Sequence, residues 1–196
     1  VMASSNAGKL AEFRQILDRD GIELLPQSEL GVGDAVEDGL SFIENAIIKA
    51  RHACCETGLP ALADDSGLEV DALDGEPGIY SARYSGITGH DADRANNEKL
   101  LSELEQVPEA ERSARFQCVI VFMRHAKDPT PLVCQGSWEG RILFEEVGSG
   151  GFGYDPLFYV PTQGCASAEL EPESKNLLSH RGQALQKFIA CWNSLR

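Results

Sequence analysis

The fold of this chain is decided by the stretch Ala61-Leu62-Ala63-Asp64-Asp65-Ser66-Gly67-Leu68-Glu69-Val70. A short apolar run ends there in two adjacent carboxylates, a hydroxyl group and a glycine. A strand that ends in carboxylates is a common way for an α/β sheet to present metal ligands or a general base. Asp-Asp-Ser-Gly is also an ordinary turn composition, so both interpretations stay open on this stretch alone. Gly67 is expected to turn the chain, and the alternation of Leu68, Val70 and Ala72 after it suggests a return strand.

The composition indicates a globular domain without a nucleic-acid or membrane partner. The chain has 196 residues, of which 42% are hydrophobic and 24% are charged, and residues 1–196 are long enough to bury one core. The formal net charge of −14 opposes binding to duplex nucleic acid or to an anionic membrane surface. The six cysteines form no Cys-x-x-Cys pair, and no signal peptide or membrane span is visible, which predicts reduced thiols in the cytoplasm.

The N-terminal segment predicts a strand, a polar loop and a helix. Apolar Val1-Met2-Ala3 is followed by Ser4-Ser5-Asn6-Ala7-Gly8-Lys9, after which apolar residues recur at helical spacing. Asn6 is suited to cap the helix, and free backbone amides beside Lys9 would bind an anion. The consensus of the P-loop fails twice here, at its first glycine and at its final hydroxyl residue. A plain capped helix with a solvated lysine stays open as the alternative.

An irregular acidic segment that carries Glu37 precedes a well-marked helix. The helix begins at Ser41 with the spacing of a capping box and continues with one apolar stripe. Another face of the same helix carries Asn45, Lys49 and His52. A solvated face explains these three side chains by itself, and a functional face stays open.

The middle of the chain predicts a polar surface helix and then a meander of strands. The helix covers residues 91–104, and residues 115–125 predict a central strand because their apolar residues fall on both faces. A turn leads back into a further strand over residues 132–138. The sheet is therefore expected to be mixed rather than wholly parallel.

The C-terminal third contains a second unusual stretch, Gly148-Ser149-Gly150-Gly151-Phe152-Gly153-Tyr154-Asp155-Pro156. Its glycines permit close backbone approach to a ligand, and Phe152 between them can stay open as a stacking surface. A plain hairpin loop is the alternative. Further on come Lys175 and then His180 and Arg181, the last two in the first turn of a helix. Cationic side chains at that end oppose the helix dipole, so helix stability does not explain them.

Taken together, these motifs resemble the inosine triphosphate pyrophosphatase family, also called Ham1 or RdgB-like, of non-standard purine nucleoside triphosphate pyrophosphatases. The resemblance covers nearly the whole length and is specific as a set. Its motifs are residues 4–9, 42–46, 63–67, 77–84, 151–156 and 179–182. The chain departs from the family at Ser4-Ser5, where Thr-Gly is usual.

The resemblance implies an α/β protein with a long bent mixed β-sheet flanked by helices, in which two lobes enclose a central cleft with the active site. It also implies a homodimer. The implied activity is Mg²⁺-dependent hydrolysis of ITP, dITP and XTP to the nucleoside monophosphate and pyrophosphate, which keeps deaminated purines out of DNA and RNA. The alternatives are a related nucleotide pyrophosphatase with another modified-base preference and a non-catalytic nucleotide-binding regulator.

The resemblance also implies a role for each matching residue. Glu37 and Asp65 would hold the metal, Asp65 would act as the general base, and Lys9 would take part in catalysis. Strand alternation points Asp64 and Asp65 to opposite faces, so Asp64 is predicted to have a structural role. The expected substrate contacts are Ser4, Ser5, Asn6, Ala7, Gly8 and Lys9 for the triphosphate, Ser66, and Phe152, Gly153, Tyr154, Asp155, Lys175, His180 and Arg181 for the nucleoside. Secondary candidates are Asn45, Lys49 and Arg83.

Overall fold

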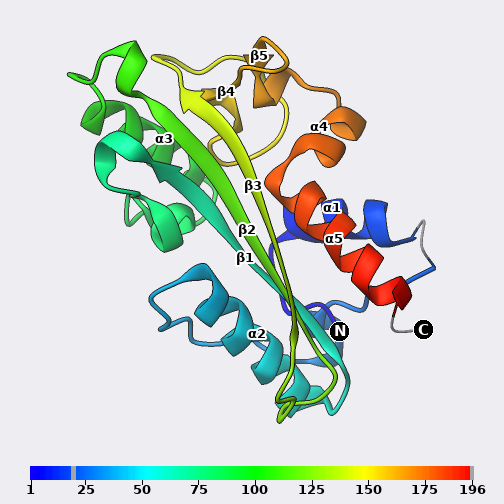
Figure 1. The fold of residues 1–196 in the computed structure, drawn as a ribbon. Helices are drawn as coiled ribbons and strands as arrows, with labels where there is room; N and C mark the ends of the chain where they lie inside the picture. Colours follow the sequence, from blue (N-terminus) through cyan, green and yellow to red (C-terminus); the bar gives the residue numbers. More distant parts are fainter. Residues whose placement is uncertain (19–20, 195–196) are drawn as a thin grey trace. The chain divides into compact units, whose positions relative to one another are not determined.

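Five strands form one sheet in the order β1-β2-β3-β4-β5 (Figure 1). The computed structural model describes residues 1–18 and 21–194. The strands are β1 (Ala61–Val70), β2 (Ser113–Met123), β3 (Leu132–Ile142), β4 (Phe158–Val160) and β5 (Cys165–Ala166). β4 is antiparallel to both β3 and β5, whereas Met2 forms isolated parallel bridges to Pro26 and Leu62. The predicted α/β class is confirmed, and parallel pairing of the expected mixed kind occurs at the isolated bridges of Met2.

The helices depend on local sequence signals to different degrees, and the first two begin at clear caps. They are α1 (Ala7–Leu17), α2 (Phe42–Thr57), α3 (Ala92–Glu103), α4 (Pro172–Leu178) and α5 (His180–Ser194). Asn6 caps α1 by accepting a backbone hydrogen bond, and Ser41 caps α2 in the same way. Gly58 ends α2 in the left-handed region with φ of 70°. None of the helices in the described ranges is both long enough and apolar enough to span a membrane.

The chain divides into two compact units, and each has its own core. Unit 1 consists of Val1–Asp65, Cys118–Gly136 and the residues from His180 onward. Unit 2 consists of Ser66–Gln117 and Ser137–Ser179. The boundary falls within β1, β2 and β3, so each of these strands contributes one part to unit 1 and the other to unit 2.

In unit 1 the strand β2 is buried on both faces, as its apolar run predicts. Cys118 and Ile120 belong to one cluster, with side chains from α1 and α5, whereas Val119 and Val121 belong to another. The second cluster includes three alanines of α2, Ala46, Ala50 and Ala53, whose small side chains allow the helix to approach the sheet closely. α2 therefore covers one face of the sheet in this unit, and α1 and α5 cover the other (Figure 1).

The core of unit 2 contains an aromatic cluster. The ring of Phe158 lies 4.5 Å from that of Phe116 and 5.3 Å from that of Trp138, measured between ring centroids. All three side chains are buried. Such offset and tilted pairs are stabilising beyond the apolar area that they bury.

The predicted turn at Gly67 is wrong, because β1 continues through it to Val70. Leu68 and Val70 are both 0% exposed in the core of unit 2, and the Leu68 amide donates to Ser81 Oγ at 2.9 Å. The burial of two branched side chains outweighs the local turn preference of Asp-Asp-Ser-Gly.

We predict that Phe158→Ala lowers the free energy of unfolding by about 3–5 kcal/mol, because it leaves a cavity in the aromatic cluster. Phe144→Ala is the matched control, since Phe144 is 57% exposed, and it should cost about 1 kcal/mol or less. Urea unfolding of the two variants measures the difference. Equal losses would show that the cluster does not carry the stability assigned to it.

Candidate active site

The strand β1 presents two adjacent aspartates to different cations. Asp64 is 1% exposed, and its Oδ2 lies 2.8 Å from Lys9 Nζ and 3.8 Å from Arg181 Nε. Asp65 is 7% exposed, and its Oδ1 accepts a hydrogen bond from Lys49 Nζ at 2.8 Å. The two carboxylates therefore have separate partners within unit 1, as the alternation of an extended strand requires.

Asp64 is held in its ionised form. Burial alone would raise the pKa of its carboxyl group, but the Lys9 ammonium and the Arg181 guanidinium outweigh burial and hold the pKa well below its usual range. For Arg181, burial would lower the pKa, but the carboxylates of Glu12 and Asp64 outweigh burial and raise it. Arg181 also donates a hydrogen bond to Glu12, so Lys9 and Glu12 form one ionic network with the buried Asp64 and Arg181 side chains.

Asp65 shares its cation with Glu37. Lys49 Nζ lies 3.2 Å from Glu37 Oε2 while it donates to Asp65. Burial would lower the pKa of Lys49, but the surrounding carboxylates raise it, so the side chain stays an ammonium. Burial raises the pKa of Asp65, and this effect outweighs the Lys49 ammonium, which lowers it. A raised pKa favours proton acceptance by the carboxylate. Within the described residues, Asp65 Oδ2 is buried and has no hydrogen-bond partner.

This second group fits a magnesium ion. Mg²⁺ binds few carboxylates and completes its shell with water and phosphate oxygens. Glu37 and Asp65 already converge on one cation, the ammonium of Lys49, and Asp65 retains a buried oxygen without a partner. Across residues 1–18 and 21–194, no group of three or more His, Cys, Asp or Glu side chains is placed to hold a metal. Water and phosphate oxygens would therefore supply most of the ligands.

The predicted phosphate loop contains hydrogen bonds from its backbone to its own side chains. Asn6 Oδ1 accepts the Lys9 backbone N–H at 3.0 Å, and Ser4 Oγ accepts the Asn6 N–H at 3.2 Å. Ser5, where the family usually has glycine, donates its hydroxyl to Asp34 Oδ2 at 2.7 Å. The departure at Ser5 thus adds a contact between this loop and the acidic segment that carries Glu37.

In unit 2 the glycine-rich loop is built around the buried carboxylate of Asp155. Its Oδ2 accepts from Lys175 Nζ at 2.6 Å and from the Phe152 backbone N–H at 2.8 Å, and its Oδ1 accepts from Ser167 Oγ at 2.8 Å. A Cβ atom at Gly151 would lie 2.1 Å from Asp155 Oδ2, so only glycine fits. Lys175 Nζ lies 5.0 Å from the centroid of the Phe152 ring, which is partly exposed. The structure therefore brings Phe152, Asp155 and Lys175 together.

Two residues that sequence reasoning missed hold the same loop from α3. Asp93 Oδ2 accepts the Gly153 N–H at 2.9 Å, and Asn97 Nδ2 donates to the Gly153 carbonyl at 3.2 Å. Asn97 is 3% exposed, although α3 is polar in sequence. Its burial depends on tertiary contacts, so no local signal could have found it.

Other predicted residues have structural partners. Tyr154 belongs to the core of unit 2 and donates its hydroxyl to the Ser81 carbonyl at 2.8 Å, so its side chain has a packing role. Arg83 lies over the Tyr80 ring, 5.2 Å from its centroid. His180, the first residue of α5, is buried in unit 1.

Comparison with known proteins identifies the family. The model of the Ham1 family matches residues 1–191. The chain belongs to the Ham1 family. It is 62% identical over 190 residues to a dITP/XTP pyrophosphatase of Vibrio parahaemolyticus, and the match covers 97% of this chain and 94% of that protein. It is 59% identical to a dITP/XTP pyrophosphatase of Escherichia coli O157:H7, and that match covers 96% of this chain and 95% of that protein. The solved HAM1 protein of Coxiella burnetii is 49% identical, with a TM-score of 0.91 over 98% of this chain and 97% of that chain.

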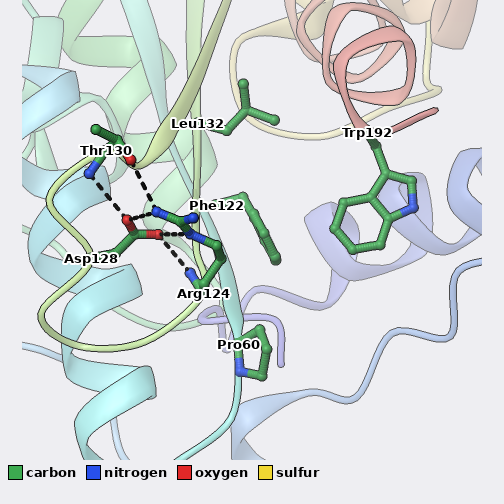
Figure 2. A pocket seen from close by; sticks show the side chains of 7 residues that line it. All are labelled: Pro60, Phe122, Arg124, Asp128, Thr130, Leu132 and Trp192. Atoms are coloured by element: carbon green, nitrogen blue, oxygen red, sulfur yellow. Dashed lines mark hydrogen bonds and ion pairs between the residues drawn. The ribbon is translucent and has the colours of Figure 1, made fainter. Parts of the chain in front are cut away.

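A separate cavity of about 520 Å³ lies in unit 1 of this Ham1 protein (Figure 2). Pro60, Phe122, Leu132 and Trp192 give it mainly apolar walls. Its two charged lining residues bind each other, with Arg124 Nε 2.8 Å from Asp128 Oδ2. None of the predicted site residues lines this cavity, so it is not part of the candidate active site.

We predict that Asp64→Asn and Asp65→Asn have opposite consequences for stability. Asp64→Asn should lower the free energy of unfolding by about 3–5 kcal/mol, because it breaks a buried ion pair. Asp65→Asn should leave it unchanged or higher, because the native state then no longer contains a carboxylate whose ionisation is disfavoured by burial. Urea unfolding at pH 7 compares the variants, and an equal loss in both would contradict the division of roles.

The pH dependence of the same unfolding free energies should also differ in sign. Asp64 has a lowered pKa, so its contribution is full above the unfolded value of about 3.9 and is lost as pH falls through the folded value. Asp65 has a raised pKa in the folded state. The wild type should therefore gain stability relative to Asp65→Asn as pH falls through the folded-state pKa of Asp65. A wild-type curve parallel to that of Asp65→Asn would contradict the raised pKa.

Proposed function

We propose that this chain hydrolyses non-standard purine nucleoside triphosphates, namely ITP, dITP and XTP, to the nucleoside monophosphate and pyrophosphate in the cytoplasm. The names of the Vibrio and Escherichia relatives support this activity. The observation that carries the proposal is the buried Asp65 carboxylate, which shares the Lys49 ammonium with Glu37 and keeps one oxygen without a partner. Hydrolysis of these substrates would remove deaminated purines from the nucleotide pool.

Glu37 and Asp65 are the residues that would hold Mg²⁺. When bound, the ion supplies positive charge to phosphate oxygens and makes nearby water more acidic. Lys49 contacts both carboxylates, so it offsets their mutual repulsion.

Asp65 acts as the general base in this proposal. It accepts a proton from the water that attacks the α-phosphorus. The new bond joins the water oxygen to the α-phosphorus. The bond from that phosphorus to the bridging oxygen breaks, and pyrophosphate leaves with the electron pair.

Lys9 and the start of α1 are assigned to the triphosphate. Residues 4–9 lie at the N-terminus of this helix, whose backbone amides and dipole favour anions. Lys9 Nζ is 2.8 Å from Asp64, which holds the long side chain in a defined position. A preorganised ammonium stabilises charge that develops on the leaving pyrophosphate.

The residues around Phe152 are assigned to the base. The Phe152 ring is 37% exposed and offers a stacking surface, while Lys175 beside it is a hydrogen-bond donor. Hypoxanthine and xanthine present an acceptor at O6, whereas adenine presents an amino group there. Recognition through such hydrogen bonds discriminates by roughly 10⁴-fold or more.

Two other functions are compatible with the family resemblance. A preference for another modified base would keep the same reaction with a different substrate. A non-catalytic nucleotide-binding regulator would bind ITP without forming a product. The retained set of Glu37, Asp65 and Lys9 favours catalysis.

The family resemblance also leads us to propose a homodimer, which light scattering after gel filtration would test.

We predict that the protein with Mg²⁺ converts ITP, dITP and XTP to monophosphate and pyrophosphate, with ATP turned over far more slowly. Anion exchange of the products measures this directly. Equal turnover of ATP and ITP, or orthophosphate with nucleoside diphosphate as products, would refute the proposal. A rise in melting temperature with ITP but no product would favour the regulator.

Asp65→Asn should reduce kcat by at least about 10²-fold, because the amide cannot accept the proton. Circular dichroism should stay at the wild-type value, and the melting temperature should be unchanged or higher. Asp128→Asn is a control for loss of a carboxylate elsewhere in unit 1, since Asp128 pairs with Arg124 outside the proposed site. Near-normal turnover by Asp65→Asn would remove Asp65 from its assigned role.

A further inference from the structure

One face of α2 binds the segment of residues 33–39 rather than facing solvent. Asn45, Lys49 and His52 lie on this face at helical spacing, and each contacts a different part of the segment. The three contacts are Gly39 N–H to Asn45 Oδ1 at 2.9 Å, Lys49 Nζ to Glu37 Oε2 at 3.2 Å, and His52 Nε2 to the Gly33 carbonyl at 3.1 Å. Because a carbonyl only accepts, His52 Nε2 is the donor in the last bond.

Gly39 allows the segment to lie against the helix. A Cβ atom at this position would lie 2.7 Å from Asn45 Oδ1 and 2.7 Å from Glu44 Cβ. A side chain there would push the backbone away from α2. The close approach and the hydrogen bond from Gly39 N–H therefore depend on each other.

Besides these contacts, the segment is held at Asp34, which accepts hydrogen bonds from Ser5 Oγ and Gln27 Nε2, both at 2.7 Å. Residues 32–39 have no helix or strand assignment, and Val36, next to Glu37, is 80% exposed. A segment without regular structure loses conformational entropy when it is fixed, so its position depends on specific contacts. The backbone bonds from His52 and Asn45 lie on either side of Glu37, four residues before it and two residues after it.

We propose that His52 and Asn45 are positioning residues that hold Glu37 in place to bind a divalent cation. This inference rests on the proposed role of Glu37 as a metal ligand. Neither side chain touches the cation itself; each fixes the backbone that carries the ligand. Outer contacts of this kind orient metal ligands and tune metal affinity.

The test measures Mn²⁺ binding to the full-length protein by electron paramagnetic resonance, without nucleotide. His52→Ala should bind Mn²⁺ about 3- to 10-fold more weakly, as expected for one lost hydrogen bond. His52→Gln should restore affinity, because its amide can donate to the Gly33 carbonyl. Gly39→Ala should weaken binding through an independent change. Arg51→Ala is the matched control, since Arg51 donates from the same helix to a different carbonyl, that of Ala126, at 3.2 Å.

Turnover of ITP gives a second readout. His52→Ala should need more Mn²⁺ for half-maximal rate, while kcat at saturating Mn²⁺ stays at the wild-type value. A merely structural role would lower stability without this split. The inference is overturned if His52→Ala binds Mn²⁺ as tightly as Arg51→Ala, or if His52→Gln does not recover affinity.

Glu37→Gln separates this inference from the proposed function. If Glu37→Gln weakens Mn²⁺ binding and His52→Ala does not, only the positioning role fails. If Glu37→Gln leaves Mn²⁺ binding unchanged, the ligand assignment fails and the positioning role is overturned with it.

Discussion

Two buried aspartates at adjacent positions of one strand need separate cations, because like charges in a poorly solvated site raise each other's pKa. In unit 1, Asp64 pairs with Lys9 and Arg181, whereas Asp65 pairs with Lys49. The two carboxylates consequently differ in character. For Asp64 the nearby cations outweigh the effect of burial, so its pKa is lowered. For Asp65 the effect of burial is the larger one, so its pKa is raised. The first is suited to a permanent ion pair and the second to proton transfer.

This pairing also explains how the helices of unit 1 are arranged around β1. Lys9 comes from α1, Arg181 from α5 and Lys49 from α2, so each helix that packs on the sheet supplies one cation. Arg181 in the first turn of α5 opposes the helix dipole, which costs about 0.3–1 kcal/mol. Breaking a buried ion pair costs about 3–5 kcal/mol, so the pairing with Asp64 and Glu12 outweighs the dipole.

Local signals predicted much of the fold, and nonlocal burial accounts for what they missed. The caps at Asn6 and Ser41 depend on neighbouring backbone, so their patterns were sufficient. Gly67 was misread as a turn because the burial of the residues after it depends on distant segments. The face with His52 could not be assigned, since the segment that covers it contacts His52 and Asn45 through backbone groups, which carry no sequence signal. Asn97 was missed because its burial depends on tertiary contacts.

The most direct measurement is a ¹³C NMR titration of the aspartate carboxyl groups, with Asp64 and Asp65 assigned by single substitutions. The account predicts that Asp65 titrates above the ordinary aspartate value of about 3.9, whereas Asp64 stays ionised throughout the pH range in which the protein is folded. The reverse order, or equal midpoints for the two residues, would contradict the division of roles between them.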